Sequence, residues 1–354
     1  MNKSHRRKII FHFLLASLFS AYACLVYSPI NTRNARAQNS EKTEKEYAKA
    51  ECVMELNTRR VLYESHGDIR LPMASTTKIA TAATVLSLCK DVGAEYEVPK
   101  EAEGIEGSSV YLKAGEKYSV EDLLYGLMLR SGNDCAVALA CYCCGNVENF
   151  SAQMNETAQK AGAMATNFRN PHGLPCDGHY TTARDLTAIT CYALENETFR
   201  QIVSTQYYSP RNWKNKNKML NSYDGAIGVK TGYTKQAGRC LVSAAERESM
   251  TLVCTVLNCP AMYERSASLL DDAFSAYEYV EIVKKGVPFE IKGQRCATEE
   301  SFSYPLLKEE KELLEIQTAG LLSPQKGANG REIIGKIEIK LLNRLLFSGN
   351  LYKL

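Results

Sequence analysis

The sequence has few histidines and almost no excess of charge of either sign. Of its five histidines, His5 and His12 lie at the extreme N-terminus, and His172 and His179 lack the four-residue spacing of helical zinc ligands. A metal site is therefore not expected. The formal net charge is only +3, so charge alone implies neither nucleic acid nor another polyanion as a partner. No internal repeat is visible.

Cysteine, by contrast, is plentiful, with 13 in the chain, of which 12 follow Ala37. Most stand singly inside apolar runs, as Cys89, Cys191 and Cys254 do, and free cysteine is among the most buried residue types. The group at 141–144 is followed by no matching pair at zinc-finger spacing. We therefore expect small core residues, and whether any cysteines pair as disulfides stays open.

Residues 1–37 have the organisation of a secretory signal peptide. Basic residues at positions 3–8 precede a mostly apolar run from Ile9 to Val26, and Ala35-Arg36-Ala37 suits a signal peptidase. The mature chain is then expected to begin near Gln38, with a polar tether over residues 38–50. The apolar run is close to the length of a membrane span, so an uncleaved anchor remains an alternative. Either way, the chain is expected outside the cytoplasm, at the membrane's outer face or in the cell wall.

The remaining chain is long enough for a large core and more than one domain. Alternating or helically spaced apolar residues predict strands at 52–56, 61–63, 227–233, 239–245 and 251–257, and helices at 75–86, 120–129, 136–140, 181–194 and 269–279. Strands at both ends of a helical middle predict an α+β fold over residues 51–284, with helices flanking a mostly antiparallel sheet. Residues 285–354 are expected to form a small β-rich C-terminal domain.

Ser75 and Lys78 stand three residues apart at the head of an apolar run. Residues at i and i+3 share a helix face, so the two side chains are expected to lie side by side. A serine hydroxyl is a weak nucleophile until a base removes its proton, and a lysine can be that base if burial or a second cation lowers its pKa. The pair alone is a weak signal, because this spacing occurs by chance about once in a chain of this length.

Two further motifs strengthen the interpretation. Ser131-Gly132-Asn133 falls in a break between two expected helices, and Lys230-Thr231-Gly232 falls on an expected strand. Each alone favours a structural role. Together with the first pair they supply a second serine, an amide, a second cation and a strand edge, which is the set that acyl transfer requires.

These motifs predict a distinct catalytic or binding role for each of several residues in one active site. The expected catalytic residues are Ser75, Lys78, Ser131, Asn133 and Lys230. Lys230 would keep Lys78 neutral or polarise Ser131, and Ser131 would relay the proton to the leaving amine. Thr231 would hold a substrate carboxylate, and Gly232 would let backbone approach closely. The N–H groups of Ser75 and Tyr233 would form an oxyanion hole.

The motifs and their surroundings resemble one family, the serine D-alanyl-D-alanine carboxypeptidases, or low-molecular-mass penicillin-binding proteins. The similar segments are residues 70–78, 107–116, 122–134, 170–174, 179–185, 228–234 and 237–242. The resemblance covers roughly Cys52 to Tyr279, and the tail resembles the family's β domain. It implies a β-lactamase/transpeptidase-like sandwich with a helical subdomain.

The resemblance also implies a reaction. Ser75 would attack the peptide bond between two terminal D-alanines of a peptidoglycan stem peptide, D-alanine would leave, and water would release the acyl-enzyme. β-Lactam antibiotics, which mimic the D-Ala-D-Ala end, would acylate the same serine and stay. No metal or organic cofactor is implied, and the biological role would be cell-wall biogenesis and the control of cell shape.

Two features depart from the family pattern. Some members bind the substrate's carboxylate with an arginine after the third motif's strands, for which Arg265 is the candidate and Arg239 a second. Many members also end in an amphipathic membrane-anchoring helix. Residues 337–346 fit a strand with a turn at Asn343-Arg344 better than such a helix. Peripheral membrane association would then be weaker, or come from the N-terminus.

Three alternatives remain open. A serine β-lactamase needs a deacylation base, usually a glutamate between the second and third motifs, and the glutamates there occupy no recognisable loop of that type: Glu148, Glu156, Glu195 and Glu197. An endopeptidase that cuts cross-links would use the same residues as the carboxypeptidase. A non-catalytic wall-binding protein would have no use for a nucleophile and two lysines together.

Overall fold

The computed structural model describes residues 48–354, so the expected signal peptide and most of the tether lie outside the described residues. The described part belongs to one compact unit. Among these residues, no helix is both long enough and apolar enough to cross a membrane.

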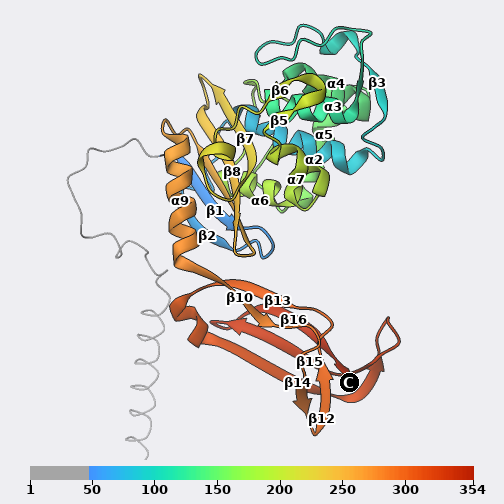
Figure 1. The fold of residues 1–354 in the computed structure, drawn as a ribbon, viewed down its shortest axis with the longest axis vertical. Helices are drawn as coiled ribbons and strands as arrows, with labels where there is room; N and C mark the ends of the chain where they lie inside the picture. Colours follow the sequence, from blue (N-terminus) through green and yellow to red (C-terminus); the bar gives the residue numbers. More distant parts are fainter. Residues whose placement is uncertain (1–47) are drawn as a thin grey trace, which may run out of the picture. The chain divides into compact units, whose positions relative to one another are not determined.

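A five-stranded antiparallel sheet forms the centre of the fold, in the order β2-β1-β9-β8-β7 (Figure 1). Its strands are β1 (Ala50–Glu55), β2 (Val61–Ser65), β7 (Ala226–Thr234), β8 (Gly238–Arg247) and β9 (Met250–Leu257). All five lie where the sequence predicted strands. Strand β7 lies at the edge and pairs only with β8 within the described chain, so the strand that carries Lys230-Thr231-Gly232 has an open side.

Helices cover both faces of this sheet. Helix α9 (Met262–Ala276) packs on one face against β8 and β9, and α6 (Ala183–Leu194) packs on the other against β1 and β9. Neighbouring residues of one strand serve different cores: Leu241 joins the core under α9, and Val242 joins the core under α6. This period-two alternation is what a strand buried on both faces requires. The predicted α+β sandwich is confirmed.

A helical subdomain extends from the α6 side and surrounds α2 (Lys78–Leu88), whose residues 78–85 are all buried. A helix that is buried on every side can begin with a lysine only if that lysine finds partners inside the protein. The other helical elements are α3 (Val120–Tyr125), the π-helical turn η4 (Gly126–Arg130), α4 (Asn133–Cys144), α5 (Val147–Lys160), α7 (Glu197–Ser204) and α8 (Met219–Ser222). Short elements complete this region: β3 (Glu95–Glu97), η3 (Lys100–Ala102), β4 (Lys117–Ser119), β5 (Tyr207–Tyr208), η5 (Ser209–Arg211) and β6 (Trp213–Lys214).

The C-terminal region is built from β-strands, as predicted, but it begins earlier than the expected boundary at residue 285. Strand β10 (Tyr277–Val283) pairs with β13 (Phe302–Leu307), so residues that the sequence assigned to the first domain belong to this region. For the same reason the predicted helix over 269–279 is shifted: α9 starts at Met262 and stops at Ala276, where the alternating Tyr277–Val283 sequence takes over as a strand.

A second five-stranded sheet makes up the rest of this region, in the order β11-β12-β16-β15-β14. Its elements are β11 (Phe289–Ile291), β12 (Gln294–Ala297), η6 (Lys308–Leu313), β14 (Leu314–Lys326), β15 (Glu332–Leu341) and β16 (Arg344–Lys353). Leu342 and Asn343, both with positive φ, turn β15 into β16. The prediction of a strand and turn over residues 337–346 is therefore confirmed against the alternative of an anchoring helix.

The cysteines of the described residues are all free, and seven of the 12 are buried, as expected of core residues. No cluster of three or more histidine, cysteine or carboxylate side chains among these residues is arranged to hold a metal ion.

Candidate active site

Ser75 lies in a tight turn, not in the body of an α-helix as the sequence suggested. The turn is the 3₁₀ helix η2 (Ala74–Thr77), and α2 begins directly after it at Lys78. Its first residue, Ala74, has a φ of 50°, and the Thr77 hydroxyl donates to the Ala74 carbonyl at 2.8 Å. In a 3₁₀ turn the side chains at i and i+3 eclipse, so Ser75 and Lys78 are brought together more directly than on an α-helix.

The loop at 170–174 clamps this turn from outside. Gly173 has a φ of 90°, and a Cβ at that position would lie 1.9 Å from the Ala74 carbonyl oxygen. The Asn170 side chain holds the loop in place by accepting the Gly173 N–H at 2.7 Å. Only glycine fits here, because both the backbone conformation and the close approach exclude a side chain.

Lys78 is fully buried, and its amine meets three polar atoms. Nζ lies 2.7 Å from Asn133 Oδ1, 2.7 Å from the His172 carbonyl oxygen and 3.0 Å from Ser75 Oγ. Burial, followed by the nearby charge of Lys230, holds the pKa of Lys78 well below its usual range. A neutral amine has two N–H donors and one lone pair. With the two acceptors satisfied by N–H groups, the lone pair is left for the Ser75 proton.

Ser131 and Asn133 enter the site from the break between η4 and α4. Ser131 has a left-handed backbone with φ 66°, and it is 5% exposed. Asn133 opens α4, and its Nδ2 donates to the Glu106 carbonyl at 2.5 Å. That contact fixes the orientation of the amide, so Oδ1 faces Lys78.

Asp134, the next residue, organises the loop beside the site. Its carboxylate accepts the Ser109 hydroxyl at 2.5 Å and the backbone N–H groups of Val110 and Leu112 at 3.0 and 3.1 Å. The loop carries Ser108, whose carbonyl accepts the Asn133 N–H at 2.7 Å. The sequence analysis assigned no role to Asp134, although an acidic residue in the first turn of an expected helix is visible in the sequence.

Strand β7 lies directly against the nucleophile turn. A Cβ on Gly232 would lie 3.0 to 3.1 Å from the backbone nitrogens of Ser75 and Thr76 and the Met73 carbonyl oxygen. Lys230, on the same strand, is 2% exposed, and its Nζ donates to the Thr231 carbonyl at 2.9 Å. Burial, followed by the charge of Lys216, lowers the pKa of Lys230 to about 7.

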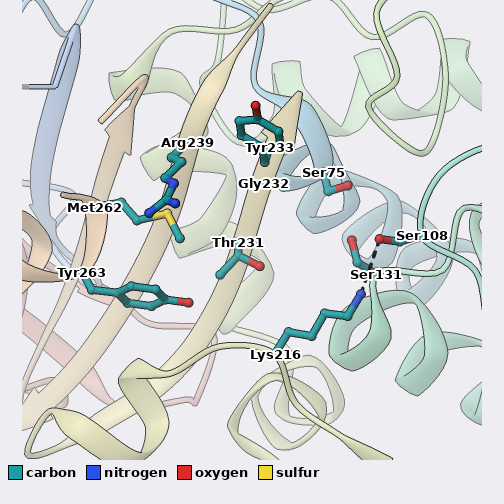
Figure 2. Close-up of a pocket in the computed structure, with 10 residues that line it drawn as sticks. All are labelled: Ser75, Ser108, Ser131, Lys216, Thr231, Gly232, Tyr233, Arg239, Met262 and Tyr263. Atoms are coloured by element: carbon teal, nitrogen blue, oxygen red, sulfur yellow. Dashed lines mark hydrogen bonds between the residues drawn. The ribbon is translucent and has the colours of Figure 1, made fainter. Parts of the chain in front are cut away.

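An open cavity of about 450 Å³ lies over these groups (Figure 2). It is lined by Ser75, Ser108, Ser131, Lys216, Thr231, Gly232, Tyr233, Arg239, Met262 and Tyr263. The structure therefore brings together the predicted catalytic residues, with Lys78, Asn133 and Lys230 buried. The sequence missed four of the lining residues: Ser108, Lys216, Met262 and Tyr263. Ser108 lies in the family-similar segment 107–116, but the other three carry no local motif, since loops and a helix start bring them to the cavity.

Arg265 is the predicted site residue that the structure places elsewhere. It does not line the cavity, and its Nε and Nη2 each lie 2.6 Å from a carboxylate oxygen of Glu51, a β1 residue with a side-chain exposure of 2%. Arg265 stands in the first turn of α9, where the helix packs over β1 and β2, so this geometry directs its guanidinium to the sheet. The expected substrate-binding role of Arg265 is corrected, and Arg239 is the arginine that lines the cavity.

No acidic residue lines the cavity among the residues that the structure describes. The four glutamates that the sequence raised as deacylation bases are likewise absent from the cavity lining: Glu148, Glu156, Glu195 and Glu197. The site therefore has a base for the attack by Ser75, but no carboxylate next to the serine to drive rapid hydrolysis of an ester formed there.

Comparisons with known proteins agree with this geometry. Residues 36–261 match the family model for the S11 peptidases, described as D-alanyl-D-alanine carboxypeptidase. The D-alanyl-D-alanine carboxypeptidase DacF of Bacillus subtilis is 32% identical over 289 residues, which cover 77% of this chain and 73% of that protein. The D-alanyl-D-alanine carboxypeptidase of Streptomyces sp. strain K15 is 36% identical, over 63% of this chain and 85% of that protein.

Solved structures show the same fold. Penicillin binding protein 5 from Haemophilus influenzae superposes with a TM-score of 0.73 at 25% identity, covering 90% of this chain and 98% of that one. The D-alanyl-D-alanine carboxypeptidase DacD from Francisella tularensis has a TM-score of 0.66 at 26% identity, covering 93% and 98% of the two chains. These alignments extend well beyond the motif residues, so the similarity includes both the sandwich and the β-rich region.

Proposed function

Because this chain belongs to the D-alanyl-D-alanine carboxypeptidases of peptidase family S11, we propose that Ser75 is the nucleophile of that reaction and Lys78 its general base. The family membership makes the chain a serine-type D-alanyl-D-alanine carboxypeptidase and a penicillin-binding protein that acts on the cell wall. The observation that carries the assignment of roles is the 3.0 Å separation of Lys78 Nζ and Ser75 Oγ, with Lys78 fully buried.

Acylation follows from the positions of these groups. Ser75 Oγ attacks the carbonyl carbon of the penultimate D-alanine, and its proton passes to the Lys78 lone pair. The N–H groups of Ser75 and Tyr233 stabilise the oxyanion. Gly232 makes this arrangement possible, because its lack of a side chain lets β7 approach the turn. A proton then reaches the leaving nitrogen through Ser131, the C–N bond breaks, and D-alanine departs with a neutral amine.

Deacylation restores the enzyme. Water attacks the ester carbonyl and gives a proton to neutral Lys78. The ester bond then breaks, and Lys78 returns the proton to Ser75 Oγ. Asn133 holds Lys78 in place through both steps, because its amide is itself fixed by the Glu106 carbonyl. No metal or organic cofactor takes part in these steps.

Lys216 and Thr231 bind the substrate's terminal carboxylate in this proposal. The leaving D-alanine lies on the Ser131 side, since Ser131 protonates its nitrogen. Lys216 reaches that side: its Nζ donates to Ser108 Oγ at 3.4 Å, next to Ser131, and Thr231 faces the same part of the cavity (Figure 2). A lysine before the third motif thus takes the role that the sequence assigned to Arg265.

The chain is exported in this proposal, with cleavage after Ala37. The support is the basic, apolar and small-residue order of residues 1–37. Contact with the outer face of the membrane is a further part of the proposal. N-terminal sequencing of the protein recovered from cells tests the cleavage: a start at Gln38 supports it, and an intact apolar segment favours the uncleaved anchor.

The reaction itself is tested with a stem pentapeptide ending in D-Ala-D-Ala. Release of free D-alanine, lost in Ser75→Ala, supports the carboxypeptidase, while cleavage of a cross-linked dimer without release of terminal D-alanine would favour the endopeptidase. Turnover of penicillin as the main activity would favour the β-lactamase. A folded protein that binds the wall polymer and does none of these would be a wall-binding module.

A further inference from the structure

The walls of the cavity carry positive charge without a matching negative charge. Two of its lining residues, Lys216 and Arg239, are cations, and no lining residue in the described chain is acidic. The β7–β8 turn from Thr231 to Arg239 adds Lys235 and contains no acidic residue. The site therefore presents a positive potential to whatever enters it.

The two lining cations come from different elements and lie apart (Figure 2). Lys216 follows β6 and lies beside Ser108 and Ser131. Arg239 lies on β8, where it is the cross-strand partner of Tyr233. The two cations therefore lie on opposite sides of the strand that carries Thr231 and Tyr233, where they can meet different groups of one ligand.

The guanidinium of Arg239 is available for a ligand. Its backbone is fixed, because its carbonyl accepts the Cys259 N–H at 2.7 Å. Its guanidinium makes one long hydrogen bond, from Nη1 to the Pro260 carbonyl at 3.4 Å, and it forms no ion pair with a carboxylate of the described chain. An arginine has five N–H donors in a planar fork that suits a carboxylate, so most of this capacity is unused.

The position of Arg239 decides which part of a substrate it meets. If the leaving D-alanine lies toward Ser131 and Lys216, the acyl part of the peptide runs in the other direction along β7, past Tyr233. Arg239 lies on that side, close to Tyr263. Burial raises the pKa of the Tyr263 hydroxyl, and the charge of Arg239 opposes this with a smaller lowering effect.

We propose that Arg239 binds a second carboxylate, on the acyl part of the stem peptide, so that the enzyme prefers peptides with a free side-chain carboxylate over their amidated counterparts. This inference rests on the proposed carboxypeptidase reaction. The recognition step is binding only: an existing carboxylate pairs with the guanidinium, and no bond is made or broken there.

The test uses two N-acylated pentapeptides that end in D-Ala-D-Ala and differ only at the third residue. Its side chain ends in a carboxylate in one peptide and in the corresponding carboxamide in the other. D-Alanine release is measured for both with the wild-type enzyme, Arg239→Gln and Lys235→Gln. The last variant removes the same charge from the same turn at a residue that does not line the cavity. The ratio of the two kcat/KM values within one protein does not depend on how much of that protein is folded.

The wild-type enzyme is expected to favour the carboxylate peptide about tenfold, the value of one well-placed charge-assisted hydrogen bond. The preference should fall toward onefold in Arg239→Gln, persist in Lys235→Gln, and weaken as salt is added, because the group is exposed. Equal rates on both peptides in the wild type, or a preference that survives in Arg239→Gln, would overturn the inference and leave the carboxypeptidase intact. Release of D-alanine from neither peptide would overturn both.

Discussion

At the residue scale, the site depends on lysines that are kept without their usual charge. Lys78 donates its two N–H groups to Asn133 Oδ1 and to the His172 carbonyl oxygen. Its remaining lone pair faces Ser75 Oγ. Lys230 is buried with one backbone acceptor, and its pKa falls to about 7. Burying a group whose charged form is favoured in water costs stability, so this arrangement serves catalysis at the expense of the fold.

This cost predicts how stability depends on pH. The unfolded chain holds the Lys230 proton up to its ordinary pKa of 10.5, while the folded protein releases it above about 7. The penalty is therefore complete below pH 7, as much as about 5 kcal/mol. It fades as pH rises toward 10.5. Lys230→Met, which has no such penalty, should be the more stable protein at pH 7.

Urea unfolding of both proteins at a series of pH values between about pH 6 and pH 10 measures this, because that range covers most of the interval between the two pKa values. The stability advantage of Lys230→Met should be largest at the acid end and shrink steadily as pH rises. An advantage that stays constant or grows with pH would mean that Lys230 keeps its ordinary pKa in the folded protein.

At the element scale, three segments from distant parts of the sequence meet at Ser75. They are the η2 turn, strand β7 and the loop at 170–174, and glycines make both contacts possible: Gly232 on the strand and Gly173 in the loop. The position of the nucleophile is therefore set by backbone packing around it as much as by its own turn.

Gly173→Ala should displace the nucleophile turn. The new Cβ would lie 1.9 Å from the Ala74 carbonyl oxygen, so the loop or the turn must move. Gly178→Ala is the matched control, because Gly178 also has a positive φ but its added Cβ meets nothing closer than 3.6 Å. Each variant should lose about 1 to 2 kcal/mol from the backbone conformation.

Only Gly173→Ala should also lose acylation by penicillin, by roughly 100-fold, since misplacement by about 1 Å has that effect. Stopped-flow acylation and thermal melting of the two variants measure both quantities. Equal acylation rates in the two variants would show that the loop does not position Ser75.

The sequence predicted these elements well where local pattern decides the structure. Strand β9 and the middle of β8 are mainly apolar and buried, and the break at Ser131-Gly132 has a clear local signal. Prediction from the sequence failed where tertiary packing determines the position of a residue. The segment around Lys216 carries no periodicity and reaches the cavity only through the fold, and Arg265 is directed to Glu51 by the packing of α9 on the sheet.

At the scale of the whole molecule, Arg60 connects the central sheet to the β-rich region. Its guanidinium lies 5.1 Å from the ring centroids of both Tyr277 and Tyr304, and it donates to the Pro305 carbonyl and to Glu310 at 2.6 Å each. The Arg60 and Glu310 side chains are only 14% and 13% exposed. Breaking a pair this well buried should therefore be costly.

Arg60→Ala is expected to cost about 3 kcal/mol of unfolding free energy, because it leaves the Glu310 carboxylate without its partner. Acylation by penicillin should change less than twofold, since the active site lies elsewhere in the fold. Lys311→Ala removes a more exposed pair, with Glu278, and should cost under about 1 kcal/mol. Denaturant unfolding followed by fluorescence compares the two. A loss of acylation in Arg60→Ala would instead link the β-rich region to the chemistry.

The central claim is that Ser75, activated by Lys78, forms the covalent intermediate, and intact-mass spectrometry after incubation with benzylpenicillin tests it most directly. The wild-type protein should gain the mass of one penicillin and keep it, because no carboxylate of the described chain lines the cavity to hasten hydrolysis. Ser75→Ala, with an unchanged melting temperature, should gain nothing. A single adduct that persists in Ser75→Ala, or a folded wild-type protein that gains no mass, would contradict the account.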